Sequence, residues 1–251
     1  MKTLEVLFTP ADFAALHRRN LEETVCVVFD IFRATTTMIT ALANGAEAII
    51  PVSEISEALA LRRQHRQTLL AGERDGLRIR GELTGGINFD LGNSPREFTS
   101  EKVAGKTIVT TTTNGTRALR SCAHARQVLI GSFLNLRATA DLILKNAPEE
   151  LLLICSGTYE QMAYEDVLGA GALGDLLLKM YADEEVSDSA RMAREIYKAA
   201  ETNLLESAGR SRNGRRLLSI PELRDDVAFG LQRDIHGFAA TLQADGKVRR
   251  L

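Results

Sequence analysis

The sequence predicts an α/β fold with mainly parallel or mixed sheets, helices on both faces and a helical C-terminal third. Short apolar runs alternate with segments of helical periodicity, which is the pattern of strands joined by crossover helices. A chain of 251 residues, 45% of them hydrophobic and 25% charged, is also long and apolar enough to bury a full core. We therefore expect a single α/β unit over residues 1–251. The alternative is two closely packed halves, about 1–100 and 101–251, with the site between them.

The predicted strands are the apolar runs at residues 4–8, 25–29, 48–52, 68–71, 107–111, 128–130 and 151–155. Helical periodicity follows most of them, at residues 34–44, 54–64, 116–123 and 136–146. Gly45 closes the first of these helices and Pro148 follows the last. Two long helical patterns, at residues 164–181 and 189–207, dominate the C-terminal third. In such sheets ligands bind beyond the carboxyl ends of the strands, so we look for a site in the residues that directly follow the apolar runs.

Charge and cysteine content limit the class of partner. The balance of 31 basic and 33 acidic residues gives no chain-wide field for nucleic acid or membrane, so any anion site must be local. No run approaches the roughly 18 apolar residues of a membrane helix, and the N-terminus enters a strand without a signal-peptide core. Three widely spaced cysteines, Cys26, Cys122 and Cys155, predict reduced thiols in a cytoplasm. We expect a small-molecule partner, no nucleic acid and no membrane.

The most informative segment is the threonine-rich run at residues 110–117, which joins an apolar strand to a helical segment. Threonine hydroxyls, an Asn-Gly turn that can hold a positive φ and the unpaired N–H groups of a helix start together favour a phosphate or sulfonate. The alternative is a β-branched strand that ends in a turn with ordinary capping. The binding candidates in this segment are Thr112, Thr113, Asn114, Gly115, Thr116 and Arg117.

Two further strand ends carry charged side chains. Asp30 and Arg33 follow the second apolar run, and Thr36 lies in the helix start after them. Glu73 and Arg74 follow the fourth run, between two glycines. Each has a structural alternative, because an aspartate in such a place is most often a helix cap and a charged segment between glycines is often a plain turn.

Two helix starts add polar groups. Asn93 or Ser94 is predicted to cap a helix whose first residue is Pro95 and whose Glu97 completes a capping box, and capping alone is the alternative to anion binding there. The pair Glu165-Asp166 opens the helix after the strand at residues 151–155. Acidic residues stabilise a helix start whatever their function.

These strand ends together predict phosphoryl transfer. Arginines and helix starts suit a polyanionic substrate, whereas acidic side chains in the same crevice need a counter-ion, most simply Mg²⁺ held by oxygen ligands. Other nucleotide motifs do not fit, because Gly105-Lys106-Thr107 precedes its strand instead of following one. The glycines at residues 169–174 lie inside a helical pattern, where they indicate close helix packing and not a dinucleotide site. The common covalent phosphatase signatures are also missing from the sequence.

In combination the motifs resemble those of the 2-phosphosulfolactate phosphatase family. The resemblance rests on residues 28–37, 72–74, 89–95, 111–119 and 131–135, on Glu165-Asp166 with Gly169-Ala170-Gly171, and on Asp234-Ile235. It implies an α/β arrangement not shared with other phosphatases. It also implies Mg²⁺-dependent hydrolysis of 2-phospho-3-sulfolactate to 3-sulfolactate and phosphate, on the route to coenzyme M.

We interpret the reaction as in-line attack by a metal-activated water, because no orthodox nucleophile stands out. The expected catalytic residues are Asp30, Arg33, Glu73, Arg74 and Asn114, and the expected metal ligands are Asp30, Glu73, Glu165 and Asp166. The expected substrate-binding residues are Thr36, Asn93, Ser94, Thr112, Thr113, Gly115, Thr116 and Arg117. Arg74 is the first candidate for the sulfonate and Arg33 the second. The alternatives are a non-catalytic binding protein for a small phosphorylated or sulfonated acid, or a phosphotransferase. The apolar helical C-terminal third predicts a homodimer.

Overall fold

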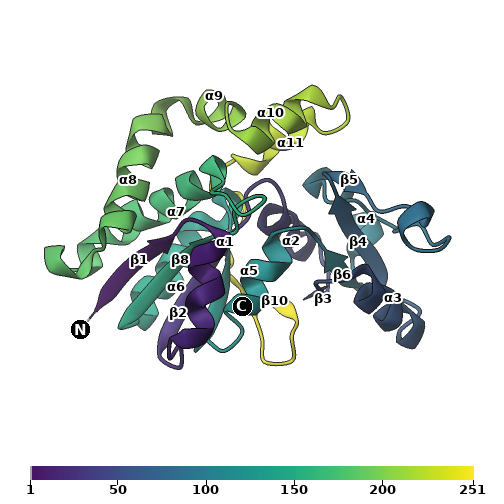
Figure 1. Ribbon diagram of the computed structural model, residues 1–251, viewed down its shortest axis with the longest axis horizontal. Coiled ribbons are helices and arrows are strands. Elements are labelled where there is room, and N and C mark those ends of the chain that lie inside the picture. The colour runs from purple at the N-terminus through teal and green to yellow at the C-terminus, as the bar shows by residue number, and fades with distance from the viewer. Residues whose placement is uncertain (1) are drawn as a thin grey trace.

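The computed structural model describes residues 2–251, in which the strands form one ten-stranded sheet (Figure 1). Across the sheet the order is β1-β8-β2-β7-β9-β10-β3-β6-β4-β5. The strands that the sequence predicts are β1 (Thr3–Leu7), β2 (Thr24–Phe29), β3 (Ala48–Pro51), β4 (Leu69–Arg74), β6 (Thr107–Thr111), β7 (Gln127–Gly131) and β8 (Glu150–Cys155). The structure adds three short strands: β5 (Leu77–Arg78), β9 (Ala240–Leu242) and β10 (Val248–Arg250).

The sheet is mixed, and its two main groups of strands are parallel. β1, β8, β2 and β7 pair in parallel on one side, and β3, β6 and β4 pair in parallel on the other. The β9–β10 hairpin joins the groups through antiparallel pairing with β7 and β3. The first group combines residues 3–29 with residues 127–155, so the sheet does not divide where the chain passes residue 100. The number of folding units stays a prediction.

Helices cover both faces of the sheet, as the sequence predicts. The helices are α1 (Pro10–Ala14), α2 (Ala34–Ala43), α3 (Ile55–Gln64), α4 (Ser100–Val103), α5 (Gly115–Ser121), α6 (Leu136–Asn146), α7 (Tyr164–Leu177), α8 (Asp188–Ala200), α9 (Leu204–Gly209), α10 (Arg212–Ser219) and α11 (Arg224–Gly230). Alternate residues of one strand enter different cores: Val27 packs with α6, α7 and α8, whereas Val28 packs with α2 and α5. This burial on both faces explains why the strand segments are continuously apolar.

The C-terminal helices α8 to α11 arch over one end of the sheet, shown in green to yellow in Figure 1. Helix α8 packs closely on α7, because a Cβ on Gly171 would lie 2.1 Å from the carbonyl oxygen of Ala193. The predicted helix-packing role is therefore confirmed for Gly171, whereas a Cβ on Gly174 would meet nothing within 4 Å. The long pattern at residues 189–207 is broken into α8, a 3₁₀ turn and α9.

No helix within residues 2–251 combines the length and the apolar character that a bilayer span requires.

Cys26, Cys122 and Cys155 are buried and free, as expected of reduced thiols. Burial raises the pKa of the Cys155 thiol well above its ordinary value, which keeps it protonated and unreactive.

Candidate active site

A pocket lies where the parallel strands β2, β4, β6 and β8 reach their carboxyl ends, as the strand pattern predicts. Helix α10 supplies the remaining wall. The pocket is lined by Asp30, Phe32, Arg33, Glu73, Asp75, Gly76, Asn93, Thr112, Thr113, Asn114, Gly157, Thr158, Tyr159, Glu165, Asp166, Asn213, Arg216 and Leu217. Strand ends from both halves of the sheet therefore meet in one place.

Nine of the predicted site residues line this pocket: Asp30, Arg33, Glu73, Asn93, Thr112, Thr113, Asn114, Glu165 and Asp166. All four predicted metal ligands and the centre of the threonine-rich segment therefore line the same pocket. Their individual roles stay predictions.

Six predicted residues lie outside the lining. The Arg74 guanidinium donates to the Glu73 carbonyl and, at 3.0 Å, to the Thr111 hydroxyl. Arg117 is half-exposed and forms an ion pair with Glu160. The buried hydroxyls of Thr36, Ser94 and Thr116 donate to Ile31, Asp226 and Thr112 respectively, and the sixth residue is Gly115.

Asp30 lies at the end of β2 and is buried. Its Oδ1 accepts a hydrogen bond from the Ala34 amide at 3.0 Å, so it partly serves the capping role that was its structural alternative. No hydrogen bond within residues 2–251 reaches its Oδ2. Burial, with the charges of Glu73 and Glu165, raises the pKa of Asp30 to about 7. Such an environment differs from that of an ordinary capping carboxylate, which is solvated and has a low pKa, and the role of Asp30 stays a prediction.

Glu73 fixes the threonine-rich segment. Its Oε1 accepts hydrogen bonds from the amide and the hydroxyl of Thr113, at 2.9 and 3.0 Å. Its Oε2 accepts from the Gly76 amide at 2.7 Å. Because both oxygens are held, Glu73 ties the end of β4 to the loop after β6, and Thr113 keeps a defined position beside Asp30.

Glu165 and Asp166 open α7 and are both buried. Asp166 accepts from the Ile31 amide at 2.8 Å and from the Gly157 amide at 3.2 Å, which joins the ends of β2 and β8. Glu165 Oε1 accepts from the Asn213 side chain at 2.5 Å, whereas its buried Oε2 has no hydrogen-bond partner among residues 2–251. Burial raises the pKa of Glu165, and burial with the charges of Asp30 and Glu165 raises the pKa of Asp166 well above its ordinary value.

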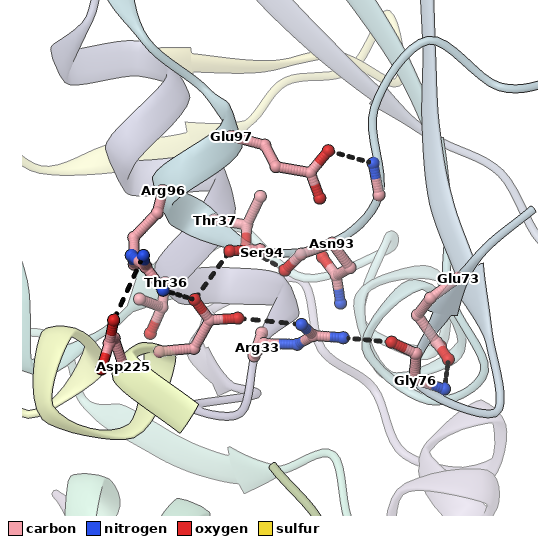
Figure 2. A network of polar contacts seen from close by, with 12 residues as sticks. Arg33, Thr36, Thr37, Glu73, Gly76, Asn93, Ser94, Arg96, Glu97 and Asp225 are labelled. Carbon is pink, nitrogen blue, oxygen red and sulfur yellow. Dashed lines mark hydrogen bonds and ion pairs between the residues drawn. The ribbon is translucent and has the colours of Figure 1, made fainter. Parts of the chain in front are cut away.

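Arg33 lines the pocket and is buried, and both of its terminal nitrogens are hydrogen-bonded. Its Nη1 donates to Asp226 Oδ2 at 2.9 Å and its Nη2 donates to the Gly76 carbonyl at 2.7 Å (Figure 2). The Asp226 carboxylate also accepts from the Ser94 hydroxyl at 2.7 Å and faces Arg96 at 3.7 Å. Asp226 is thus the centre of a buried network that joins α11 to the pocket.

Two local predictions are wrong. Ser94 does not cap a helix, because Pro95 begins only a 3₁₀ turn (Pro95–Glu97) and the Ser94 hydroxyl is committed to Asp226. Glu97 instead bonds Arg78 and the Gly92 amide, so there is no capping box. Ser94 and Glu97 therefore bond residues distant in the chain or in the preceding loop, and not the backbone of a helix start.

The conformation predicted for Gly115 is also wrong. Gly115 is the first residue of α5 and is not among the glycines with positive φ. A Cβ there would lie 2.6 Å from Asp30 Oδ2 and 2.7 Å from the Ala34 Cβ. The residue is required for the close approach of α5 to Asp30, and not for a left-handed turn.

Several lining residues were not predicted from the sequence, among them Asp75, Tyr159, Asn213 and Arg216. Asp226, which bonds Arg33 from outside the lining, was not predicted either. The Asp75-Gly76 turn, with φ of 55° and 76°, has the sequence signature of a tight hairpin turn and directly follows Arg74. Tyr159 lies in the turn after β8, and its hydroxyl donates to Asp75 at 3.0 Å. Local signals therefore existed for Asp75 and Tyr159. No comparable signal marks the residues of α10 and α11.

The donor set of the pocket fits a hard cation such as Mg²⁺. Within the described residues 2–251, Glu165 Oε2 and Thr112 Oγ1 are buried oxygens without hydrogen-bond partners, and Asp30 uses only Oδ1 as a side-chain acceptor. Within residues 2–251, no three His, Cys, Asp or Glu side chains form a group placed to hold a metal ion. Mg²⁺ commonly takes only one or two protein carboxylates and completes its shell with water and substrate phosphate oxygens, so this arrangement suits it.

Comparison with known proteins places the chain in a family. A family model described as 2-phosphosulpholactate phosphatase matches residues 12–245. The chain belongs to the 2-phosphosulfolactate phosphatase family. The match spans every residue that lines the pocket.

Members of the 2-phosphosulfolactate phosphatase family also align over most of their length. A probable 2-phosphosulfolactate phosphatase of Caldanaerobacter subterraneus is 40% identical over 91% of both chains. Proteins of the same name from Caldicellulosiruptor saccharolyticus and Carboxydothermus hydrogenoformans are 39% and 40% identical, over 85% and 88% of this chain and 87% and 86% of their own. The resemblance that the strand-end motifs indicate is therefore confirmed.

Proposed function

We propose that this protein is a Mg²⁺-dependent phosphomonoesterase that hydrolyses 2-phospho-3-sulfolactate to 3-sulfolactate and phosphate. The observation that carries the proposal is the pocket itself, in which the carboxylates of Asp30 and Glu165 lie at strand ends beside the polar segment Thr112-Thr113-Asn114. The relatives are named as 2-phosphosulfolactate phosphatases, and the pocket offers the groups that such a reaction needs.

The excess of acidic side chains in the pocket favours the binding of a cation. The pocket lining carries five carboxylates (Asp30, Glu73, Asp75, Glu165 and Asp166) against two guanidinium groups, those of Arg33 and Arg216. A substrate with phosphate, carboxylate and sulfonate groups would be repelled by this set. A bound Mg²⁺ would offset the repulsion, lower the pKa of a bound water and neutralise charge on the phosphoryl oxygens.

The side chains of the pocket would bind the metal ion and orient the substrate. Asp30 and Glu165 are the ligands best suited to the metal, because each has a carboxylate oxygen without a hydrogen bond. Asp166 and Glu73, whose oxygens are held by backbone amides, keep the strand ends in register. Thr112, Thr113 and Asn114 would contact the phosphate. Burial of Asp30, Glu165 and Thr112 keeps bulk water from these groups and strengthens their polar contacts.

The proposal is tested by measuring phosphate release from a panel of three-carbon phosphoacids, with Mg²⁺ and without any added acceptor. A hydrolase releases phosphate and prefers 2-phospho-3-sulfolactate to phospholactate. A phosphotransferase would need an acceptor, and a non-catalytic binding protein would bind the compounds without turnover. Either of these results would contradict the proposal.

Three finer assignments belong to the same proposal: a role in coenzyme M biosynthesis, a cytoplasmic location and a homodimeric state. Buried, free cysteines fit a reducing compartment. Exposed apolar side chains on the C-terminal helices, Met192, Leu205 and Leu218, offer contacts for a second copy. Light scattering coupled to gel filtration tests the dimer.

A further inference from the structure

Arg216 lines the pocket, is exposed and leaves most of its guanidinium N–H donors unused within residues 2–251. We infer that it binds the sulfonate of the substrate and so sets the specificity of the enzyme. The inference rests on the proposed function, and it goes beyond it by assigning one side chain to one anionic group.

The other arginines near the pocket are already engaged. Arg33 is 4% exposed, and its two terminal nitrogens bond Asp226 and the Gly76 carbonyl. Arg74 bonds backbone and threonine oxygens outside the lining, and Arg117 pairs with Glu160. Arg74 and Arg117 therefore lie outside the pocket wall, and Arg33 is held in place by two contacts. One of these is a buried ion pair, which is costly to break.

Arg216 has a different environment. It is exposed, lies in α10 and lines the pocket on the same helical face as Asn213 and Leu217, at spacings of three and four residues. Leu217 is buried and anchors this face, while Asn213 bonds Glu165 and Thr158 at the pocket floor. These contacts hold helix α10 against the pocket and so place Arg216 in its lining.

The guanidinium of Arg216 makes one hydrogen bond within residues 2–251, to the carbonyl of Asp75. A guanidinium has five N–H donors, so most of them remain free for a ligand. Within residues 2–251 the Asp75 carboxylate forms no ion pair with Arg216, and its Oδ1 accepts a hydrogen bond from the Tyr159 hydroxyl. Nε of Arg216 lies 3.6 Å from the position of a Cβ on Gly76, so the group rests against the Asp75-Gly76 turn. This turn positions Arg216 without neutralising it.

The chemistry of the substrate favours the sulfonate over the carboxylate as the partner. The carboxylate is attached directly to the carbon that carries the phosphate ester, whereas the sulfonate projects from the next carbon and reaches one bond further. A group at the exposed rim suits the anion that lies farthest from the buried phosphate. A sulfonate also stays fully ionised and presents several acceptor oxygens, which match the fork of a guanidinium.

The test compares kcat/KM for 2-phospho-3-sulfolactate and phospholactate in the full-length Mg²⁺-loaded enzyme. We expect Arg216→Ala to lower the ratio of the two values about 10- to 100-fold, because a charge-assisted contact is lost only where the sulfonate exists. Arg216→Lys should lower the ratio less. Arg215→Ala is the matched control, because Arg215 is exposed, adjacent and bonded to the Arg210 carbonyl outside the pocket, so its ratio should stay that of the wild type.

An unchanged ratio, or an equal loss for both substrates, would overturn the assignment of Arg216. Failure of the proposed function gives a different result, since the wild type would then release phosphate from neither compound. In that case calorimetric binding of 3-sulfolactate and lactate to the wild type and Arg216→Ala provides the same comparison without turnover. Equal losses for the two ligands would overturn the inference there as well.

Discussion

Arg33 and Asp226 form a buried ion pair at 2.9 Å, although 193 residues separate them in the chain. Their side chains are 3% and 0% exposed. The pair connects the end of β2, where Asp30 lies, to α11 of the C-terminal helices. The C-terminal third is therefore connected to the pocket by a buried ion pair. Water does not reach this pair, so it cannot replace either partner.

We predict that Asp226→Asn destabilises the protein by about 3–5 kcal/mol, because it leaves the Arg33 charge buried without a counter-charge. Urea unfolding measures the change. The neighbouring Asp225→Asn is the matched control: its side chain is 66% exposed and its ion pair with Arg96 is long, at 3.3 Å, so we expect a change below about 1 kcal/mol. Equally small effects for both variants would show that the buried pair adds nothing to the fold.

A second prediction concerns pH and Asp30 in the metal-free protein. Because the pKa is raised from 3.8 to about 7 in the folded state, the folded protein binds more protons than the unfolded chain between these values. The free energy of unfolding in EDTA should therefore fall as the pH rises from about 4 to about 7. Asp30→Asn keeps an oxygen for the Ala34 amide and removes the titrating group, so the fall should become smaller.

The check is urea unfolding at pH 5 and pH 8, both in chelator, for the wild type, Asp30→Asn and the exposed control Asp225→Asn. The control should keep the wild-type difference in the free energy of unfolding between the two pH values.

With Mg²⁺ present, Asp30→Asn should also lower turnover at least about a hundredfold, because a lost metal ligand damages the transition state more than the fold. Wild-type turnover together with a wild-type pH profile would mean that Asp30 is only a helix cap.

A third prediction tests the contact between Gly115 and Asp30. Gly115→Ala should lower kcat/KM for all phosphate esters by a similar factor, because the added Cβ would lie 2.6 Å from Asp30 Oδ2 and displace it. The control is Gly174→Ala in α7, where a Cβ meets nothing within 4 Å. This control should keep activity and stabilise the protein by about 0.5–1 kcal/mol, as expected for a helical glycine. A Gly115→Ala enzyme with normal activity would contradict the close approach.

Much of the site could be predicted because strand ends are visible in the sequence. Asp30, Glu73 and Thr112 directly follow or end apolar runs, and parallel pairing brings such ends to one edge of the sheet. The orientation of each side chain was harder to predict. Glu73 and Arg74 are neighbours on β4, so their side chains point to opposite faces, and only Glu73 lines the pocket. Strand alternation could have separated them in advance.

The contribution of the C-terminal helices could not be predicted in the same way. The amphipathic pattern of α10 shows which residues are apolar, but not which element they pack against. Asn213 and Arg216 reach the pocket because α10 docks across the strand ends, and this docking is set by long-range contacts such as Asn213 with Glu165. The prediction of Ser94 as a helix cap was wrong for the same reason. Its hydroxyl donates to Asp226, which lies 132 residues away in the chain.

The most direct test of the central claim is phosphate release from 2-phospho-3-sulfolactate by the full-length protein in EDTA, followed by addition of excess Mg²⁺ and no acceptor. Two buried carboxylates with unoccupied oxygens, Asp30 and Glu165, predict that the chelator abolishes hydrolysis and that Mg²⁺ restores it. The Asp30→Asn enzyme should not recover. Full hydrolysis in the chelator would contradict the account, as would a protein that stays inactive after Mg²⁺ is returned.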